Sequence, residues 1–287
     1  MNLDAIKTVA VLGAGTMGNG IAHVFAKAGY AVILRDVEKR FLDRALESIG
    51  KNLDREVKKG KLAESDKSKI LGRILPTTDS AALARADFVV EAVPERLDLK
   101  LAVLKEADQA LRPEVVLASN TSSISITALA AATSRADRFL GMHFMNPVPV
   151  MVLIEVVRGL QTSEATLALT MALCEKLEKK PVAVNDAPGF VSNRVLMPMI
   201  NEAAYCVLEG VAATEAVDTV MKLGMNHPMG PLELADFIGL DVCLDILEVL
   251  YSGFADTKYR PCPLLRKMVA AGWLGRKCGR GFYTYGG

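Results

Sequence analysis

The chain has 287 residues, and 34 Lys and Arg side chains stand against 33 Asp and Glu side chains, which gives a formal net charge of +1. This length suffices for one large domain or two of ordinary size, and the balanced charge argues against nucleic acid as the main partner. Hydrophobic residues make up 51% of the chain and charged residues 23%, a composition typical of a globular protein rather than a disordered one.

Short apolar runs rich in β-branched residues alternate with helical patterns through residues 1–184. This alternation predicts an α/β domain with a doubly wound, Rossmann-type parallel sheet and crossover helices. A long amphipathic helix is expected around residues 41–53, with shorter helices at 97–111 and 163–177. The predicted strands are residues 8–12, 31–34, 88–93, 115–119, 139–143 and 182–184.

From residue 185 onward the strand pattern does not return. Helical periodicity is found at residues 190–209, 214–223 and 232–251, after a turn signal at 186–189. We therefore predict a second, all-helical domain over residues 185–287. Its apolar helix faces favour burial against a second copy of the chain, so at least a homodimer is expected.

Neither of the two longest uncharged runs has the composition of a membrane span. Residues 8–26 contain four glycines, and residues 115–134 are rich in Ser and Thr. The N-terminus lacks the features of a secretory signal, so we expect a cytoplasmic protein with no membrane partner. The five cysteines are widely spaced, which fits neither a disulfide framework nor a close-spaced zinc site, and no metal is predicted.

Gly13, Gly15 and Gly18 form a Gly-x-Gly-x-x-Gly motif between the first predicted strand and an apolar helix. The motif predicts a tight turn, close approach of a pyrophosphate and close helix packing. Asp36 ends the second strand, where a carboxylate can bond ribose hydroxyls and would repel a 2′-phosphate. The sequence thus predicts an NAD site, although the adjacent Arg35 weakens the preference over NADP. The alternative is a glycine turn with a surface aspartate.

His143 ends a predicted strand, and in an open α/β sheet that end faces the ligand crevice. Glu155 lies in an otherwise apolar run, where a carboxylate is costly unless it is paired, and a cationic histidine is a suitable partner. The two residues are therefore candidates for acid–base chemistry. The alternative is a structural pair that only fixes the domain junction.

Five segments together closely resemble the 3-hydroxyacyl-CoA dehydrogenase family, and single-function members without a fused hydratase are most similar in length. The resemblance runs from residue 9 to residue 285. The segments are the glycine motif and residues 119–123, 141–157, 186–194 and 230–236. It implies NAD-dependent oxidation of L-(S)-3-hydroxyacyl-CoA to 3-oxoacyl-CoA and the reverse, with a preference for the four-carbon substrate 3-hydroxybutyryl-CoA.

The resemblance also implies a role for each matching residue. His143 would be the general base and acid, and Glu155 would orient its ring. Ser122 would touch both the substrate oxygen and the cofactor, and Asn193 would face the acyl group from a helical domain that binds substrate. The further contacts it implies are Glu95, Lys100, Asn146 and Lys277 for the cofactor, and Asn52 and Lys59 for coenzyme A.

Other interpretations of these residues stay open. Ser122 and the asparagines could be turn residues at strand ends, and Lys100 and Lys277 could be solvated surface side chains. The same two-domain plan could serve a sibling dehydrogenase that acts on a free hydroxy acid or sugar acid. The chain could also be a nucleotide-binding sensor or structural protein without turnover, since a fold alone does not fix a function.

Overall fold

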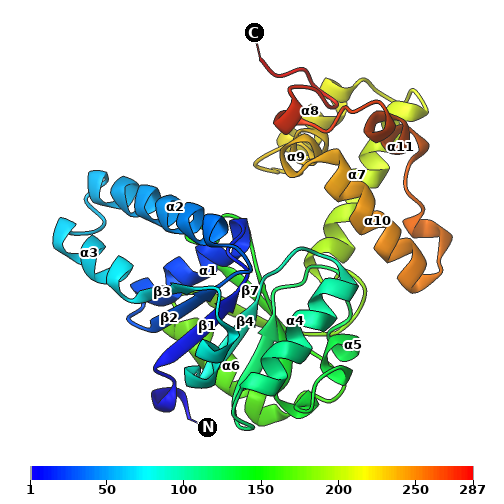
Figure 1. The fold of residues 1–287 in the computed structure, drawn as a ribbon. Helices are drawn as coiled ribbons and strands as arrows, with labels where there is room; N and C mark the ends of the chain where they lie inside the picture. The colour runs from blue at the N-terminus through cyan, green and yellow to red at the C-terminus, as the bar shows by residue number, and fades with distance from the viewer. Residues whose placement is uncertain (1, 287) are drawn as a thin grey trace. The chain divides into compact units, whose positions relative to one another are not determined.

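The computed structural model describes residues 2–286 and divides into two compact units, one ending at Asp186 and the other beginning at Ala187. In Figure 1 the first unit runs from blue to green, and the second, all-helical unit from yellow to red. The predicted fold class, a Rossmann-type sheet followed by a helical domain, is confirmed.

One eight-stranded sheet forms the centre of the first unit, in the order β3-β2-β1-β4-β5-β6-β7-β8. The first six strands of this order are parallel to one another and have the 3-2-1-4-5-6 order of a dinucleotide-binding sheet. The strands are β1 (Thr8–Leu12), β2 (Ala31–Arg35), β3 (Ile74–Thr77), β4 (Phe88–Glu91), β5 (Val116–Ser119), β6 (Phe139–Phe144), β7 (Leu153–Arg158) and β8 (Lys180–Asn185).

The predicted sheet is parallel except at one place, where β7 runs antiparallel to β6. Only residues 145–152 connect these strands, and a parallel crossover needs a dozen or more residues. The chain therefore turns straight back. The predicted strands omit two of the eight, β7 and β3. Strand β3 is a four-residue edge strand that contains Pro76, and a proline within a run argues against a central strand but is tolerated at a sheet edge.

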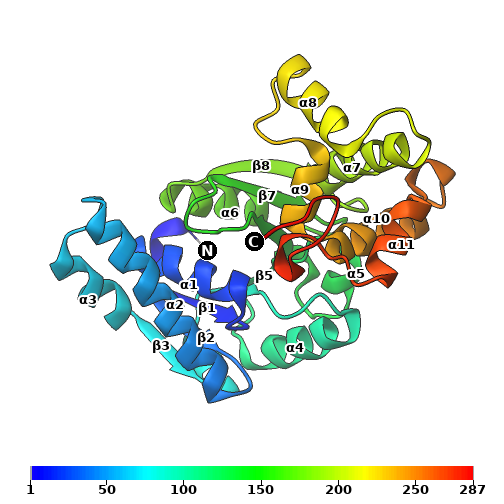
Figure 2. The ribbon, with the colours of Figure 1, turned by 90° about the horizontal axis from the view of Figure 1, so that it is seen from above.

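Helices cover both faces of the sheet, as Figure 2 shows, with α1 and α6 on one side of the strands and α4 and α5 on the other. The predicted long helix is confirmed as α2, which buries Leu42, Ala45, Ile49 and Leu53. Helices α3 and α5 were not predicted. The helices of this unit are α1 (Thr16–Lys27), α2 (Lys39–Lys58), α3 (Glu64–Gly72), α4 (Leu97–Ala110), α5 (Ile126–Ala131) and α6 (Glu164–Lys176).

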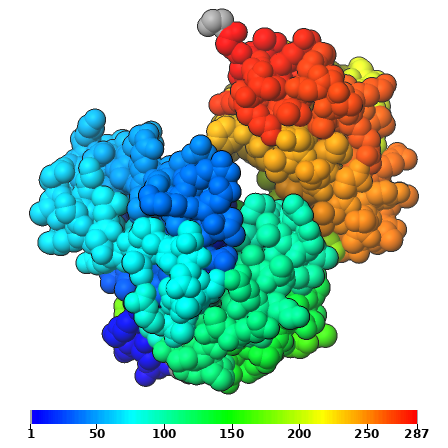
Figure 3. Space-filling model, viewed as in Figure 1, coloured from blue at the N-terminus to red at the C-terminus, as the bar shows by residue number. Residues whose placement is uncertain are grey.

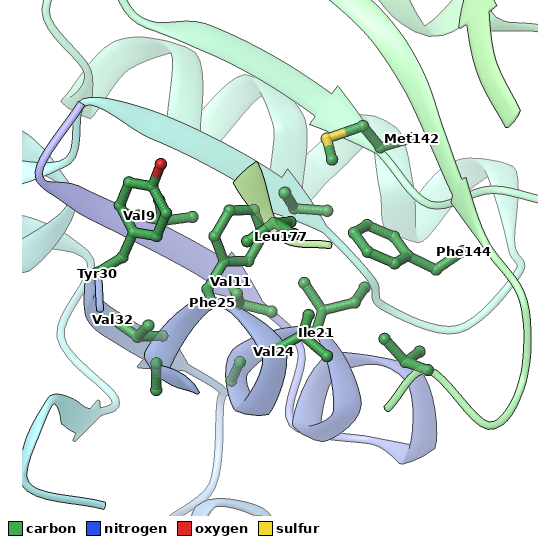
Figure 4. Packing of buried hydrophobic residues seen from close by; sticks show 14 of the residues in the cluster. Val9, Val11, Ile21, Val24, Phe25, Tyr30, Val32, Met142, Phe144 and Leu177 are labelled. Carbon is green, nitrogen blue, oxygen red and sulfur yellow. The ribbon is translucent and has the colours of Figure 1, made fainter. Parts of the chain in front are cut away.

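The largest core cluster lies between the sheet and helices α1, α2 and α6. In Figure 4 the side chains of Ile21 and Phe25 from α1 point toward Val11 on β1 and toward Met142 and Phe144 on β6. Because side chains alternate along a strand, the residue between Met142 and Phe144 points to the opposite face. Packing of this core therefore fixes the direction of the side chain at position 143.

The second unit is built from five helices within residues 187–286: α7 (Ser192–Leu208), α8 (Thr214–Gly224), α9 (Pro231–Ile238), α10 (Leu240–Phe254) and α11 (Pro263–Ala270). The continuous helical stretch expected at residues 232–251 is wrong, because Gly239 has a φ of +109° and separates α9 from α10. Within the part of the chain that the structure describes, no helix combines the length and apolar character that a bilayer crossing requires.

His23 on α1 is a buried polar side chain, with no exposed surface. Among residues 2–286, neither of its ring nitrogens has a hydrogen-bond partner, and the Glu56 carboxylate lies 3.6 Å from Nε2. The pKa of His23 is lowered to about 4, chiefly because the ring is buried; the Glu56 charge opposes this shift, and the charges of Lys27 and Lys179 add to it. The folded protein therefore holds the His23 ring in its neutral form.

We expect this histidine to make the fold sensitive to acid. Because the unfolded chain binds the proton at a pKa of 6.5 and the folded chain only at about 4, stability is lost as the pH falls between those values. In denaturant unfolding, the free energy of unfolding of the wild type should fall by about 2 kcal/mol more than that of His23→Leu when the pH is lowered from 7 to 5. Equal losses in the two proteins would contradict this explanation.

Candidate active site

The glycine turn after β1 has the conformation and the space that a dinucleotide needs. Gly13 has a φ of +100°, which L side chains rarely adopt. A Cβ atom on Gly18 would lie 1.8 Å from the Gly13 carbonyl oxygen, whereas one on Gly15 would meet no atom of the described residues within 4 Å. The fold itself thus requires Gly13 and Gly18, and Gly15 leaves space for a pyrophosphate at the N-terminus of α1.

Asp36 lies beside this turn at the end of β2. Its carboxylate accepts hydrogen bonds from the N–H groups of Ala14 at 2.6 Å and Val37 at 2.7 Å, and a carboxylate has acceptor sites to spare for ribose hydroxyls. The Arg35 guanidinium donates to the Ser80 hydroxyl at 2.9 Å and the Glu106 carboxylate at 3.0 Å. Since Arg35 is engaged in these bonds, the residues present fit NAD rather than NADP.

His143 and Glu155 are directly opposed residues of the antiparallel pair β6–β7, so their side chains lie on the same face of the sheet. Both are buried, and Nδ1 of His143 lies 2.8 Å from Oε2 of Glu155. The pairing that the sequence predicts is therefore present. When Nδ1–H donates to the carboxylate, the lone pair of the neutral ring is on Nε2.

The loop after β5 brings Ser122 to the other side of the histidine ring. Ser122 Oγ lies 3.0 Å from His143 Nε2. The loop reaches this position because β5 is the parallel neighbour of β6, with Ser119 opposite Gly141. Glu155, His143 and Ser122 thus form a continuous polar row at the end of the parallel strands.

Glu95 and Lys100 also lie at this edge of the sheet, next to the Ser122 loop. The Lys100 side chain is 1% exposed, and its ammonium lies 2.8 Å from the Glu91 carboxylate and 3.3 Å from the Glu95 carboxylate. The alternative interpretation of Lys100 as a solvated surface side chain is therefore wrong. Glu91 ends β4, Glu95 lies in the loop after it, and Lys100 lies in the first turn of α4.

Three residues without a predicted role also hold the site together: Glu91, Ser119 and Asn120. Glu91 is buried and accepts a hydrogen bond from the Ser119 hydroxyl. The Asn120 side-chain oxygen accepts the N–H of Phe144 at 2.9 Å, which ties the loop to the end of β6. Glu91 carried a usable signal, since it is a carboxylate within the apolar run 88–93, as Glu155 is within its own run.

One pocket of about 300 Å³ lies within the first unit, between the start of α1, one face of α2 and the loop after β6. It brings together Asn52 and Asn146, which the family resemblance assigned to coenzyme A and to the cofactor. Lys51 and Arg55 are its cationic lining residues. Lys59 follows the end of α2 as an exposed residue and does not line it. In Figure 3 the blue to cyan atoms of α2 and α3 form an exposed surface of the unit.

Two predicted site residues belong to the second unit. Asn193 lies in the first turn of α7, and Lys277 lies near the C-terminus, where its ammonium forms an ion pair with the Asp241 carboxylate at 2.5 Å. Their roles stay predictions that rest on the family resemblance.

Two domain models of one protein family match nearly the whole chain. The model of the 3-hydroxyacyl-CoA dehydrogenase NAD binding domain matches residues 8–187, and the model of the 3-hydroxyacyl-CoA dehydrogenase C-terminal domain matches residues 189–285. This chain belongs to the 3-hydroxyacyl-CoA dehydrogenase family. Family membership confirms the resemblance indicated by the motifs, the NAD-dependent class of enzyme and the cofactor.

Individual members of the family are similar along nearly the whole chain. A probable 3-hydroxybutyryl-CoA dehydrogenase from Bacillus subtilis is 57% identical over 98% of both chains. One from Deinococcus radiodurans is 58% identical over 96% of this chain and 99% of its own. The crystal structure of (S)-3-hydroxybutyryl-CoA dehydrogenase from Ralstonia eutropha has a TM-score of 0.96 and 54% identity, covering 99% of this chain and 100% of that one.

Substitutions of Gly15 and of Gly18 should have different effects, the first on cofactor binding and the second on folding. Gly15→Ala adds a methyl group in open space, so we expect the melting temperature to stay within about 2 °C while NADH affinity falls at least about tenfold, because the methyl group occupies the pyrophosphate space. Gly18→Ala forces a backbone clash and should lower the melting temperature. Fluorescence titration measures the NADH affinity, and thermal unfolding measures the melting temperature. Undiminished affinity in Gly15→Ala would move the pyrophosphate away from this turn.

Proposed function

We propose that this protein oxidises (S)-3-hydroxyacyl-CoA to 3-oxoacyl-CoA with NAD and catalyses the reverse reduction, with 3-hydroxybutyryl-CoA and acetoacetyl-CoA as its substrate pair. The observation that carries the proposal is the row of Glu155, His143 and Ser122 at the sheet edge where the glycine turn fits NAD. Membership of the family, and the names of relatives more than half identical to this chain, support the substrate class.

His143 is the proposed general base. Its Nε2 takes the proton of the 3-hydroxyl group, and in the reverse direction the same nitrogen returns it. Bound NAD supplies the acceptor for the hydride that leaves the same carbon. Glu155 holds the ring through Nδ1 at 2.8 Å, which fixes the tautomer that has its proton on Nδ1 and its lone pair on Nε2, and stabilises the imidazolium once the proton has moved.

Ser122 is the proposed hydrogen-bond partner of the reacting oxygen. Its hydroxyl group can donate to one acceptor, and its oxygen retains lone pairs for a second contact. From its position 3.0 Å from Nε2, it can orient the substrate hydroxyl toward the base. Such placement reduces the entropy that must be lost at the moment of reaction.

The pocket between α1 and α2 is the proposed site for part of coenzyme A. Lys51 and Arg55 provide positive charge there, and the Asn52 side-chain oxygen accepts a hydrogen bond from Arg55 at 3.1 Å. Phosphate groups are bound well by such cations. A free hydroxy acid has no adenosine phosphate, so this pocket supports the acyl-CoA substrate over the free-acid alternative.

We also propose a homodimer that associates through the second unit. Large apolar side chains on α8 and beside its two ends are exposed, at 70% for Val211, 61% for Val220, 83% for Leu223 and 62% for Met225. Apolar surface of this kind favours association with a second copy. The cytoplasmic location stays a prediction.

Substrate class is tested by following NADH oxidation with acetoacetyl-CoA and with free acetoacetate in parallel, and we expect turnover only with the thioester. Equal turnover of the free acid would favour the sibling dehydrogenase.

The pocket is tested by Arg55→Glu, which should raise the KM for acetoacetyl-CoA roughly tenfold, about 1.4 kcal/mol, and leave NADH affinity unchanged. Lys59→Glu examines the family-implied contact in the same assay. Lys69→Glu, an exposed residue paired with Asp66 on α3, is the matched control.

The proposed base is tested by His143→Gln, which keeps a polar side chain of similar size. We expect kcat to fall by about 10²- to 10⁴-fold while NADH affinity is retained, since the glycine turn and Asp36 are untouched. Stopped-flow turnover and fluorescence titration measure the two quantities. Turnover near that of wild type would remove His143 from the mechanism.

A further inference from the structure

The loop that joins β6 to β7, residues 145–152, forms one wall of the pocket between α1 and α2. Its lining residues are Asn146, Pro147, Val148 and Pro149. Pro147 and Pro149 have no backbone N–H group to donate. The N–H groups of Val150 and Met151 both donate to one acceptor, the Pro147 carbonyl oxygen, at 2.9 and 3.0 Å. A loop with so few donors of its own depends on contacts from the elements around it.

The side chain of Lys179 supplies such a contact. Its ammonium group donates to the carbonyl oxygen of Val148 at 2.6 Å and to that of Met151 at 2.7 Å. One cation therefore joins two points of the loop that lie three residues apart. The Val148 side chain is 2% exposed and packs against α1, where a Cβ atom on Gly20 would lie 2.8 Å from the Val148 Cβ. The pocket wall is thus held by a buried ammonium and by close packing on a glycine.

The end of α6 fixes the backbone at Lys179. Glu178 has a φ of +58°, its N–H group donates to the Glu175 carbonyl oxygen at 2.9 Å, and the Lys179 N–H group donates to the Cys174 carbonyl oxygen at 3.1 Å. These two bonds around a left-handed residue form the Schellman motif that ends many helices. The lysine therefore extends from a rigid point of the fold toward the loop.

The Lys179 side chain is in a place that does not favour a charge. The residue is 8% exposed; burial and the nearby Lys27 charge lower its pKa, while the Glu178 charge opposes this shift. A buried ammonium group is costly unless its protons are bonded, and the two loop carbonyl oxygens accept them. Hydrogen bonds from a charged donor are about twice as strong as neutral ones, so these two bonds restrain the loop firmly.

We propose that Lys179 is a positioning residue: its two bonds hold residues 145–152 in the arrangement that forms the pocket wall, so the lysine sets the KM for the acyl-CoA substrate without touching it. The link to KM rests on the proposed function, which assigns this pocket to coenzyme A; the placement of the loop does not. His143 and Glu155 are held by the ladder between β6 and β7, so the effect is expected on KM rather than on kcat.

The decisive variant is Lys179→Met, which keeps an unbranched side chain and removes the donors. If a binding-competent arrangement is populated only part of the time, the apparent affinity falls by that fraction. We expect the KM for acetoacetyl-CoA to rise about tenfold, with kcat within about twofold and the dissociation constant for NADH within about threefold. Lys179→Arg retains the charge and can donate to two acceptors, so its KM should stay within about threefold of wild type.

Lys180→Met is the matched control, because it removes the same group from the exposed neighbouring residue. Its KM should equal that of wild type. An unchanged KM in a folded Lys179→Met protein would overturn the proposal, as would an equal rise in Lys180→Met, which would indicate a general loss of positive charge. A fall in kcat or in NADH affinity with KM preserved would also overturn it.

Hydrogen exchange gives a readout that needs no turnover. The amides of Val150 and Met151, which donate within the loop, should exchange at least about tenfold faster in Lys179→Met than in wild type or Lys180→Met, because the loop opens more often. Equal exchange in the three proteins would contradict the proposed restraint. Faster exchange without turnover of acetoacetyl-CoA would leave the restraint in place and count against the proposed function alone.

Gly20→Ala tests the same loop if Lys179→Met does not fold. Its methyl group would displace Val148 and leaves the buried ammonium in place, so the KM for acetoacetyl-CoA should again rise while kcat is kept. An unchanged KM in this variant, with exchange at Val150 and Met151 accelerated, would show that the position of the loop does not set KM.

Discussion

The buried pair of His143 and Glu155 depends on the register of one antiparallel strand pair. The loop of residues 145–152 returns the chain beside β6, and in the resulting register these two residues face each other. A shift of the register by one residue would move the glutamate to the other face of the sheet. An unpaired carboxylate would then be buried against the apolar core beneath α1 and α6. The pairing and the register of the sheet therefore support each other.

The same edge of the sheet collects the other chemistry of the first unit. The parallel strands end there with the glycine turn after β1, Glu91 on β4, Ser119 on β5 and His143 on β6. Buried charges at this edge are arranged in compensated groups: the Lys100 ammonium lies between two carboxylates, and Glu155 lies against the imidazole. Charged side chains can lie in such a dry region because each is close to an opposite charge or a hydrogen-bond donor.

Local patterns predicted the elements whose signal is carried by a few adjacent residues. Strand β1, the amphipathic helix α2 and the glycine turn follow from periodicity and from the backbone freedom of Gly13. Where the local signal was weak or shared between elements, the predictions were wrong. Strand β3 contains a proline, and the break at Gly239 lies within a stretch whose apolar periodicity continues on both sides.

The sequence by itself determined the family, the cofactor class and the pairing of a histidine with a glutamate twelve residues away, because each depends on residue types at short spacing. Only the tertiary structure decided that the Lys100 ammonium lies between the carboxylates of Glu91 and Glu95. A lysine and a glutamate in a polar stretch look like surface residues along the chain, and it is the packing of β4, β5 and α4 around them that buries the ammonium between two acids. Burial and charge pairing are properties of side chains brought together in space, which no local pattern records.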